Sequence, residues 1–124
     1  MRTIVEYFEK VQFLVKSLSH VEIERYDEQL LSLRRGNLKI RLRFADNSLL
    51  EISEAIEEKE GVFLWLSYRY HYQRADGGIL FRYDNTPHHP ELSTHPDHKH
   101  TNDSVVSSER PGLEEVLTDV KQYL

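Results

Sequence analysis

Five histidines lie within thirteen residues of the chain, and their imidazoles are the groups best suited to chemistry. The segment from Pro87 to His100 reads PHHPELSTHPDHKH. An imidazole titrates at about pH 6.5, so two of them can supply one base and one acid at neutral pH. Imidazoles also bind zinc, nickel or copper, and Asp97 or Glu91 could complete such a shell. The candidate metal ligands are His88, His89, His98 and His100. A third interpretation is a polar loop whose histidines hydrogen-bond to its own backbone.

A pair of strands before this segment adds arginines to the histidines. The turn Asp76-Gly77-Gly78 separates Tyr68-Arg69-Tyr70-His71-Tyr72 from Phe81-Arg82-Tyr83-Asp84-Asn85 and predicts a hairpin. Arg69 and His71 then share one face of a sheet with Arg82. The structural alternative is an ordinary solvent face for Arg69 and His71, with the tyrosines in the core.

RNA cleavage needs the kinds of group that this hairpin and the histidine segment offer. A base takes the proton of a 2′-hydroxyl, an acid protonates the leaving 5′-oxygen, and cations stabilise the charge on the phosphate. Exposed aromatic side chains can stack on bases. The candidate catalytic residues are Arg69, His71, Arg82, His88, His89, His98, Lys99 and His100.

The charges of the chain are segregated along the sequence, although the net charge is −5. Residues 29–45 contain five cations and no acid, whereas residues 46–60 contain six acids and one lysine. Lys39, Arg41 and Arg43 alternate with apolar residues, so they form a cationic row on one face of a strand that could bind RNA phosphates. The alternative is that these cations pair with acids of neighbouring strands.

Composition limits the classes of protein to which the chain can belong. It has 124 residues, of which 39% are hydrophobic and 30% charged, so residues 1–124 form a single globular domain. The absence of cysteine excludes disulfides, thiolate catalysis and iron–sulfur clusters. No glycine-rich phosphate loop, Gly-x-Ser-x-Gly or His-Glu-x-x-His sequence supports a kinase, a common serine hydrolase or a zincin. The longest apolar run, Val62 to Leu66, has five residues, which predicts no membrane span and a cytoplasmic location.

Hydrophobic periodicity predicts the elements that must position these groups. Thr3 and Glu6 have the spacing of a capping box at the start of a first helix. Its apolar stripe consists of Ile4, Phe8, Val11, Val15 and Leu18. An antiparallel meander of about five strands follows, then a long histidine-rich loop over residues 84–108 and a C-terminal helix with Leu113, Val116, Leu117 and Val120. The predicted class is α+β, with both helices on one face of the sheet.

Three local features of the predicted sheet can be checked against the structure. Gly36-Asn37 reads as a turn. A three-residue loop at residues 46–48 pairs Ala45 with Leu49, and thereby places Arg43 opposite Glu51. In the long strand, alternation places Leu64 and Leu66 on the same face as the tyrosines.

Five pieces of the chain resemble the TumE toxin family of type II toxin–antitoxin modules. They are the opening helix through Tyr7-Phe8, residues 38–54, residues 68–72, residues 81–91 and residues 96–100. At the last piece the family tends to have Pro-His-His-Lys-His, where this chain has Asp97 as the second residue. The resemblance implies a small cytoplasmic toxin encoded beside a DNA-binding antitoxin that neutralises it. The predicted architecture is also similar to that of the RelE-like ribonuclease toxins, which cut RNA without metal.

Two hypotheses follow from the residues and the resemblance. The first is a metal-independent ribonuclease toxin without cofactor, whose partners are the antitoxin and RNA, with or without the ribosome. The second is a non-enzymatic partner-binding module in which the histidines hold a structural divalent metal such as zinc.

Overall fold

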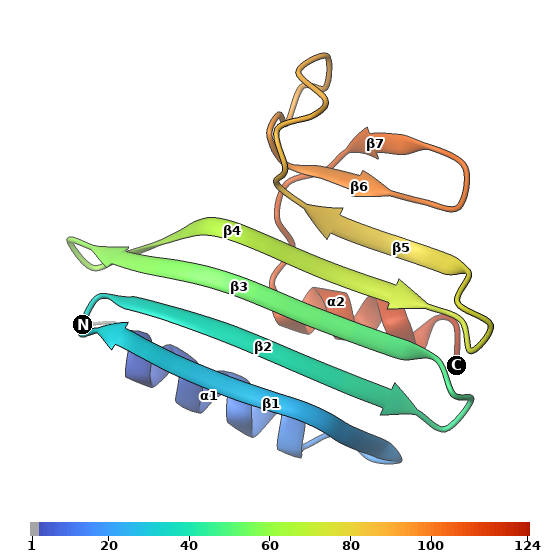
Figure 1. Ribbon diagram of the computed structural model, residues 1–124, viewed down its shortest axis with the longest axis horizontal. Helices are drawn as coiled ribbons and strands as arrows, with labels where there is room; N and C mark the ends of the chain where they lie inside the picture. The colour runs from blue at the N-terminus through green and yellow to red at the C-terminus, as the bar shows by residue number, and fades with distance from the viewer. Residues whose placement is uncertain (1–2) are drawn as a thin grey trace.

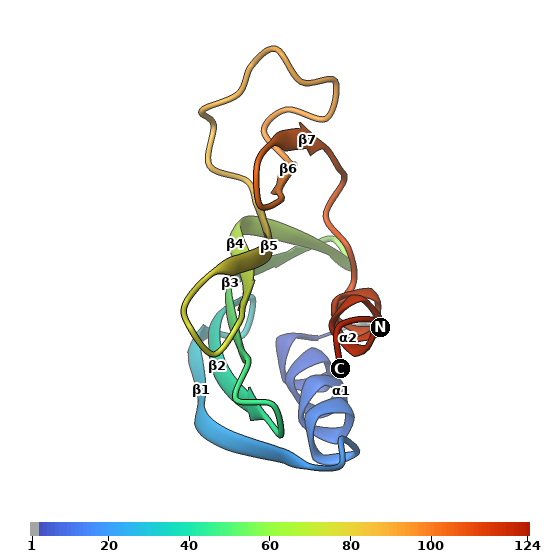
Figure 2. The same cartoon turned by 90° about the vertical axis from the view of Figure 1, so that its right-hand side faces the viewer.

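The computed structural model describes residues 3–124, which form one antiparallel sheet and two helices. The seven strands lie in sequence order, and both helices pack on the same face of the sheet (Figures 1 and 2). The elements are α1 (Ile4–Lys16), β1 (Val21–Ser32), β2 (Arg35–Phe44), β3 (Leu49–Lys59), β4 (Val62–Gln73), β5 (Ile79–Asp84), β6 (His98–His100), β7 (Val105–Ser107) and α2 (Leu113–Lys121). The α+β class is confirmed, with seven strands in place of about five.

The first helix begins where the sequence predicts. The Thr3 hydroxyl accepts a hydrogen bond from the backbone N–H of Glu6 at 3.1 Å, which caps the first turn. The apolar stripe of α1 is buried against the sheet: Ile4, Phe8, Val11 and Val15. The corresponding residues of α2 are buried in the same layer: Leu113, Val116, Leu117 and Val120.

The two faces of the sheet differ in chemistry because side chains alternate along each strand. Under the helices the strands present apolar residues and tyrosines, and Tyr70 and Tyr72 have no exposed surface. The tyrosines therefore belong to the core and are not available to stack on bases. The opposite face, which we call the open face, lies away from α1 and α2 (Figure 2).

A β-bulge between Ala55 and Ile56 changes which residues of β4 lie under the helices. It pairs Trp65 with Ile56, and the rings of Phe63 and Trp65 lie 5.5 and 5.8 Å from the ring of Tyr7. The bulge shifts the alternation by one residue. Leu64 and Leu66 are exposed. The prediction that they share the core face with the tyrosines is therefore wrong.

Gly36 lies inside β2, so the prediction of a turn at Gly36-Asn37 is wrong. The turn between β1 and β2 is formed by Leu33 and Arg34. A Cβ on Gly36 would lie 2.7 Å from Ile4 and 2.8 Å from Phe8. The glycine is therefore required by the close approach of α1 to the sheet, not by a turn.

The loop between β2 and β3 has three residues, as predicted, but it starts one residue earlier. Phe44 donates its N–H to the carbonyl of Ser48 at 3.0 Å, so the loop is residues 45–47. Asn47 has a φ of 66°, a conformation that asparagine tolerates in such loops. Arg41 therefore lies opposite Glu51, and the prediction that Arg43 does so is wrong. The register shifts by two residues, so every side chain keeps its predicted face.

The predicted loop over residues 84–108 contains two additional strands. β6 pairs with β5 and β7 pairs with β6, which extends the sheet beyond the hairpin (Figure 1). Each has three residues, too few for an alternating pattern to be recognised in the sequence. No helix within residues 3–124 is long and apolar enough to span a membrane.

Candidate functional site

Two rows of polar side chains cross the open face from β2 to β6. They arise because the strands are in register, so that residues on neighbouring strands lie side by side. The first row contains Lys39, Ser53, Arg69, Asp84 and His98. The second row contains Arg41, Glu51, His71, Arg82 and His100. The structure therefore brings Arg69, His71 and Arg82 together, as the hairpin predicted.

A hollow of about 310 Å³ opens between these rows, and we call it the basic hollow. Its lining includes Lys39, Arg41, Glu51, Ser53, Arg69, His71 and Arg82. A second hollow of about 300 Å³ lies on the other side of Arg69 and Arg82, toward Asp84 and Thr86. The two arginines therefore stand between two concave parts of the open face.

The cations around the basic hollow are not equally available to a ligand. Glu24 of β1 accepts from Arg41 at 2.9 Å and from Arg43 at 3.1 Å. Hydrogen bonds from Arg43 and Arg41 accordingly lower the pKa of the Glu24 carboxyl. Within residues 3–124, no carboxylate lies within 4.0 Å of three other cations: Lys39, Arg69 and Arg82. Of the predicted RNA-binding row, Lys39 has no acidic partner, Arg41 is paired with Glu24, and Arg43 is paired outside the hollow.

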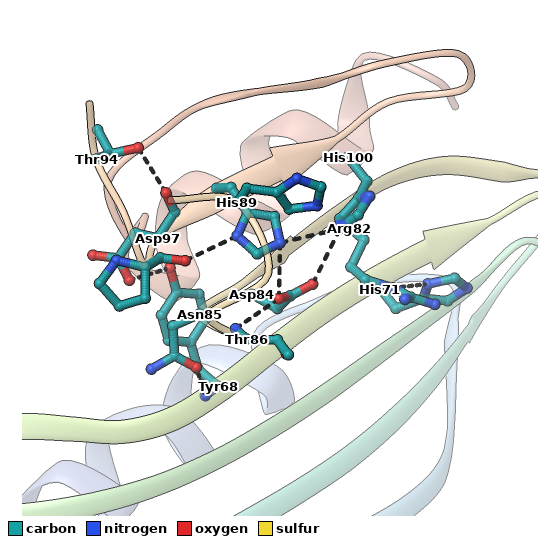
Figure 3. A network of polar contacts seen from close by, with 12 residues as sticks. Tyr68, His71, Arg82, Asp84, Asn85, Thr86, His89, Thr94, Asp97 and His100 are labelled. Atoms are coloured by element: carbon teal, nitrogen blue, oxygen red, sulfur yellow. Dashed lines mark hydrogen bonds and ion pairs between the residues drawn. The ribbon is translucent and has the colours of Figure 1, made fainter. Parts of the chain in front are cut away.

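His71 is held in one tautomer by its two neighbours. Arg82 donates its Nε–H to Nδ1 of His71 at 3.1 Å, so Nδ1 carries a lone pair (Figure 3). Nε2 lies 3.0 Å from Oε1 of Gln73 and therefore carries the ring proton. Burial, together with the charges of Arg82 and Arg69, lowers the pKa of His71 below its ordinary value. His71 is thus a neutral imidazole at neutral pH and can accept a proton.

Three histidines and one aspartate lie close together at the edge of the open face (Figure 3). We call this group the His–Asp cluster; it consists of Asp84, His89, His98 and His100. Nε2 of His98 lies 3.0 Å from one carboxylate oxygen of Asp84, and Nε2 of His100 lies 3.6 Å from the other. His98 and Asp84 are almost completely buried. Burial is the main cause that lowers the pKa of His100. Asp84 was missed as a cluster member by sequence reasoning, which named Asp97 and Glu91.

The segment that carries His89 is anchored to β4 and β6. The Tyr68 hydroxyl donates to Asp97 at 2.9 Å, and the Thr94 hydroxyl donates to the Asp97 carbonyl at 2.6 Å. The side-chain oxygen of Asn85 accepts from the Tyr68 N–H at 3.1 Å. Asp97 therefore holds the loop to the sheet and lies outside the His–Asp cluster.

Two of the predicted catalytic residues lie apart from the rest. Lys99 points to the helix-covered face, where its ammonium lies 4.9 Å from the ring centre of Tyr83 and 5.6 Å from that of Phe81. The alternation of β6 separates it from His98 and His100. His88 is exposed and is not part of the group formed by the other three histidines.

Under the helices lies a buried carboxylate that the sequence did not reveal. Glu54 accepts hydrogen bonds from the hydroxyls of Tyr7 and Tyr70 and from the indole N–H of Trp65. The guanidinium of Arg110 lies 3.9 Å from the carboxylate and 3.5 Å from the ring centre of Trp65. Burial raises the pKa of Glu54 above its ordinary value. We interpret this group as a structural connection between α1, β3, β4 and the segment before α2.

Replacing Glu54 with alanine is expected to lower the free energy of unfolding by about 3 kcal/mol. The reason is that two hydroxyls and one indole N–H lose their buried acceptor, while Arg110 loses its counter-ion. Urea denaturation measures the change. Glu9→Ala, an exposed change on α1, serves as control and should cost less than about 0.5 kcal/mol. Equal stability of the two variants would contradict the structural assignment.

The comparisons with known proteins bear on nearly the whole chain. The model of the family described as Toxin TumE matches residues 11–124, which confirms the resemblance found in the sequence. No curated protein and no solved structure matches the chain. The similarity to RelE-like toxins therefore stays a prediction.

Proposed function

Since this chain belongs to the family of Toxin TumE and is thus the toxin of a toxin–antitoxin pair, we propose that it acts by cleaving RNA on the open face of its sheet. A toxin of this kind implies an antitoxin as partner. We further propose that this antitoxin binds DNA and that the toxin meets its RNA in the cytoplasm, either free or on the ribosome. The predicted reaction uses side chains of the protein and needs no metal ion for the chemical step.

The proposal rests on one observation, the basic hollow with a neutral imidazole beside unpaired cations. Lys39, Arg69 and Arg82 have no acidic partner among the described residues, so they can bind a phosphate without first breaking an ion pair. The hollow of about 310 Å³ is at the lower end of the range for small-ligand sites. A single phosphodiester with its ribose is a ligand of suitable charge for this surface.

The chemical step can be assigned to these residues. His71 takes the proton of the 2′-hydroxyl through Nδ1, the 2′-oxygen bonds to phosphorus, and the bond from phosphorus to the 5′-oxygen breaks. Arg69 and Arg82 stabilise the negative charge that builds on the phosphate oxygens. Guanidinium groups do not release protons at neutral pH, so the proton for the 5′-oxygen comes from the Lys39 ammonium.

Substrate binding would itself release the base. In the structure Arg82 donates to the Nδ1 lone pair of His71. A phosphate oxygen is a charged acceptor and forms a stronger hydrogen bond to a guanidinium than a neutral imidazole does. When Arg82 turns to the phosphate, Nδ1 becomes free to take the proton.

The histidine segment has a supporting part in this proposal. His98 is 2% exposed, which leaves it no access to a substrate, and Lys99 faces away from the open face. His100 is the Cα partner of Arg82 on β6 but is not part of the lining of the basic hollow. We therefore assign the chemistry to the sheet, and to the loop the role of holding β5 and β6 in place.

The function is tested with a defined RNA and the same oligonucleotide carrying 2′-deoxyriboses. The protein is expected to cut the RNA, to leave a 2′,3′-cyclic phosphate, and to leave the deoxy form intact, because the 2′-oxygen is the nucleophile. The reaction is run with free RNA and with translating ribosomes. Equal cutting of both oligonucleotides would contradict the mechanism. No cutting in any of these reactions would contradict the ribonuclease itself and favour a partner-binding module.

A further inference from the structure

The His–Asp cluster has the geometry of a metal site that the proposed RNA chemistry does not use. Its members come from three segments: Asp84 ends β5, His89 lies in the loop of residues 85–97, and His98 and His100 lie in β6. One nitrogen of each histidine lies within 4.8 Å of the others. The cluster is therefore a point at which these three segments meet.

The distances between the polar atoms of Asp84, His98 and His100 match those between ligands of one ion. The two Nε2 atoms of His98 and His100 are 3.1 Å apart, and they lie 3.0 and 3.6 Å from the carboxylate oxygens of Asp84. Metal–ligand bonds of about 2.0–2.1 Å in a tetrahedron place the ligand atoms about 3.3 Å apart. The three observed separations lie on both sides of that value.

The hydrogen bonds outside the cluster orient the rings as they do in metal sites. Nδ1 of His98 lies 2.9 Å from the carbonyl oxygen of Pro96, which can only accept, so Nδ1 carries a proton. Nδ1 of His89 lies 3.2 Å from the carboxylate of Glu91. Each contact leaves Nε2 of its ring as the atom that can bind a metal. Asp84 also accepts a hydrogen bond from the backbone N–H of Thr86, at 2.9 Å.

The proton on Nδ1 of His98 leaves its Nε2 without a hydrogen to donate to Asp84 in the neutral ring. With its proton on Nδ1, neutral His98 presents a lone pair to the carboxylate of Asp84 and to Nε2 of His100. Lone pairs that face a buried carboxylate are repulsive unless a positive charge lies between them. A bound cation satisfies the three groups at once, and three imidazoles with one carboxylate are donors preferred by zinc and its neighbours in the first transition row.

We propose that Asp84, His89, His98 and His100 bind one divalent transition-metal ion that fastens the histidine loop and β6 to β5. Four protein ligands leave no open coordination position, and His98 is buried, so the ion is structural. It closes the loop and thereby supports the strand that carries Arg82. This inference does not depend on what the protein does to RNA.

The test uses the full chain, purified without an affinity tag, stripped with a chelator and then titrated with Zn²⁺ and with Co²⁺. We expect one Zn²⁺ per chain by calorimetry, a melting temperature that falls on stripping and returns with one equivalent of Zn²⁺, and a Co²⁺ spectrum with the intense visible bands of tetrahedral coordination. None of these readouts measures RNA cleavage, so they are independent of the proposed function.

Matched variants within the same segment separate a built site from histidines in general. His89→Ala and His100→Ala should each weaken Zn²⁺ binding by about 100-fold or more, since each removes a direct ligand. His88→Ala and His95→Ala, which change exposed histidines outside the cluster, should bind as the wild type does. The buried His98 is left unchanged so that the variants fold.

Two results would overturn the proposal. The first is a stripped protein that takes up no stoichiometric Zn²⁺ and melts at an unchanged temperature, which would mean that a proton on His98 pairs with Asp84. The second is Zn²⁺ binding that weakens equally in His88→Ala and His100→Ala, which would mean adsorption to the loop surface.

Discussion

Replacing His71 with alanine is expected to reduce RNA cleavage by about 10²–10⁴-fold, the usual contribution of a general base. His71 is the one imidazole in the lining of the basic hollow, and its Nδ1 carries a lone pair. The change removes a half-buried side chain from the open face and leaves the core under the helices intact. Initial rates on a defined RNA measure the effect, and circular dichroism checks that the variant is folded.

The pH profile gives a second, independent readout of the same assignment. Burial and the neighbouring arginines lower the pKa of His71 below its ordinary value of about 6.5. A base must be unprotonated to act, so kcat/KM should be independent of pH near neutrality and fall as the pH drops through that lowered pKa. In His71→Ala this decline on the acid side should be absent.

His88→Ala is the matched control for His71→Ala. It removes an imidazole that is exposed and outside both the basic hollow and the His–Asp cluster. We expect its rate and pH profile to be those of the wild type. If the two variants lose activity to the same extent, the base lies in the loop and the assignment of His71 is wrong.

Replacing Arg82 with glutamine is expected to reduce cleavage by about 10²–10³-fold, as does the loss of one donor to a developing oxyanion. Arg82 has two parts in the proposed reaction: it binds the phosphate, and by doing so it releases Nδ1 of His71. We expect the substitution to lower kcat by a larger factor than it raises KM, because the charge on the phosphate oxygens is greatest in the transition state.

Arg43→Gln is the control for Arg82→Gln, because it removes the same charge from the same face. Arg43 is paired with Glu24 and lies outside the lining of the basic hollow. We therefore expect cleavage within a few-fold of the wild type and a comparable salt dependence. A loss as large as that of Arg82→Gln would show that the whole cationic row binds RNA, as the sequence alone suggested.

The structural metal ion changes how a chelator experiment on cleavage must be interpreted. Loss of activity in EDTA is expected of a metal-dependent nuclease, but also of a protein whose loop is fastened by zinc. The two cases differ in the melting temperature, which changes together with activity only in the second. Cleavage and stability should therefore be measured in the same chelator, at a temperature well below the melting point of the stripped protein.

Local patterns in the sequence are enough to predict the layers of this protein and the face on which its polar groups lie. The stripe of α1 and the alternation from Leu38 to Phe44 are local patterns with the periods of a helix and a strand, so they can be read without tertiary information. The pairing of Arg69, His71 and Arg82 follows from one short hairpin, whose turn residues are specific. Even the error in the β2–β3 register kept each side chain on its face, because the shift was even.

Contacts between distant segments show which of these polar groups are free to act and which already have a partner. Glu24 forms ion pairs with Arg41 and Arg43, which lie 17 and 19 residues further along the chain. These pairs form across the β1–β2 hairpin, whose register the sequence did not reveal. Asp84 joins the histidines only because the three-residue β6 pairs with β5, and Glu54 collects donors from α1, β4 and Arg110. Such groupings depend on bulges, short strands and close contacts such as that at Gly36, which have no periodic signature. Residue periodicity therefore predicts faces, whereas the partners of each charge depend on contacts between distant segments, and those contacts determine its chemistry.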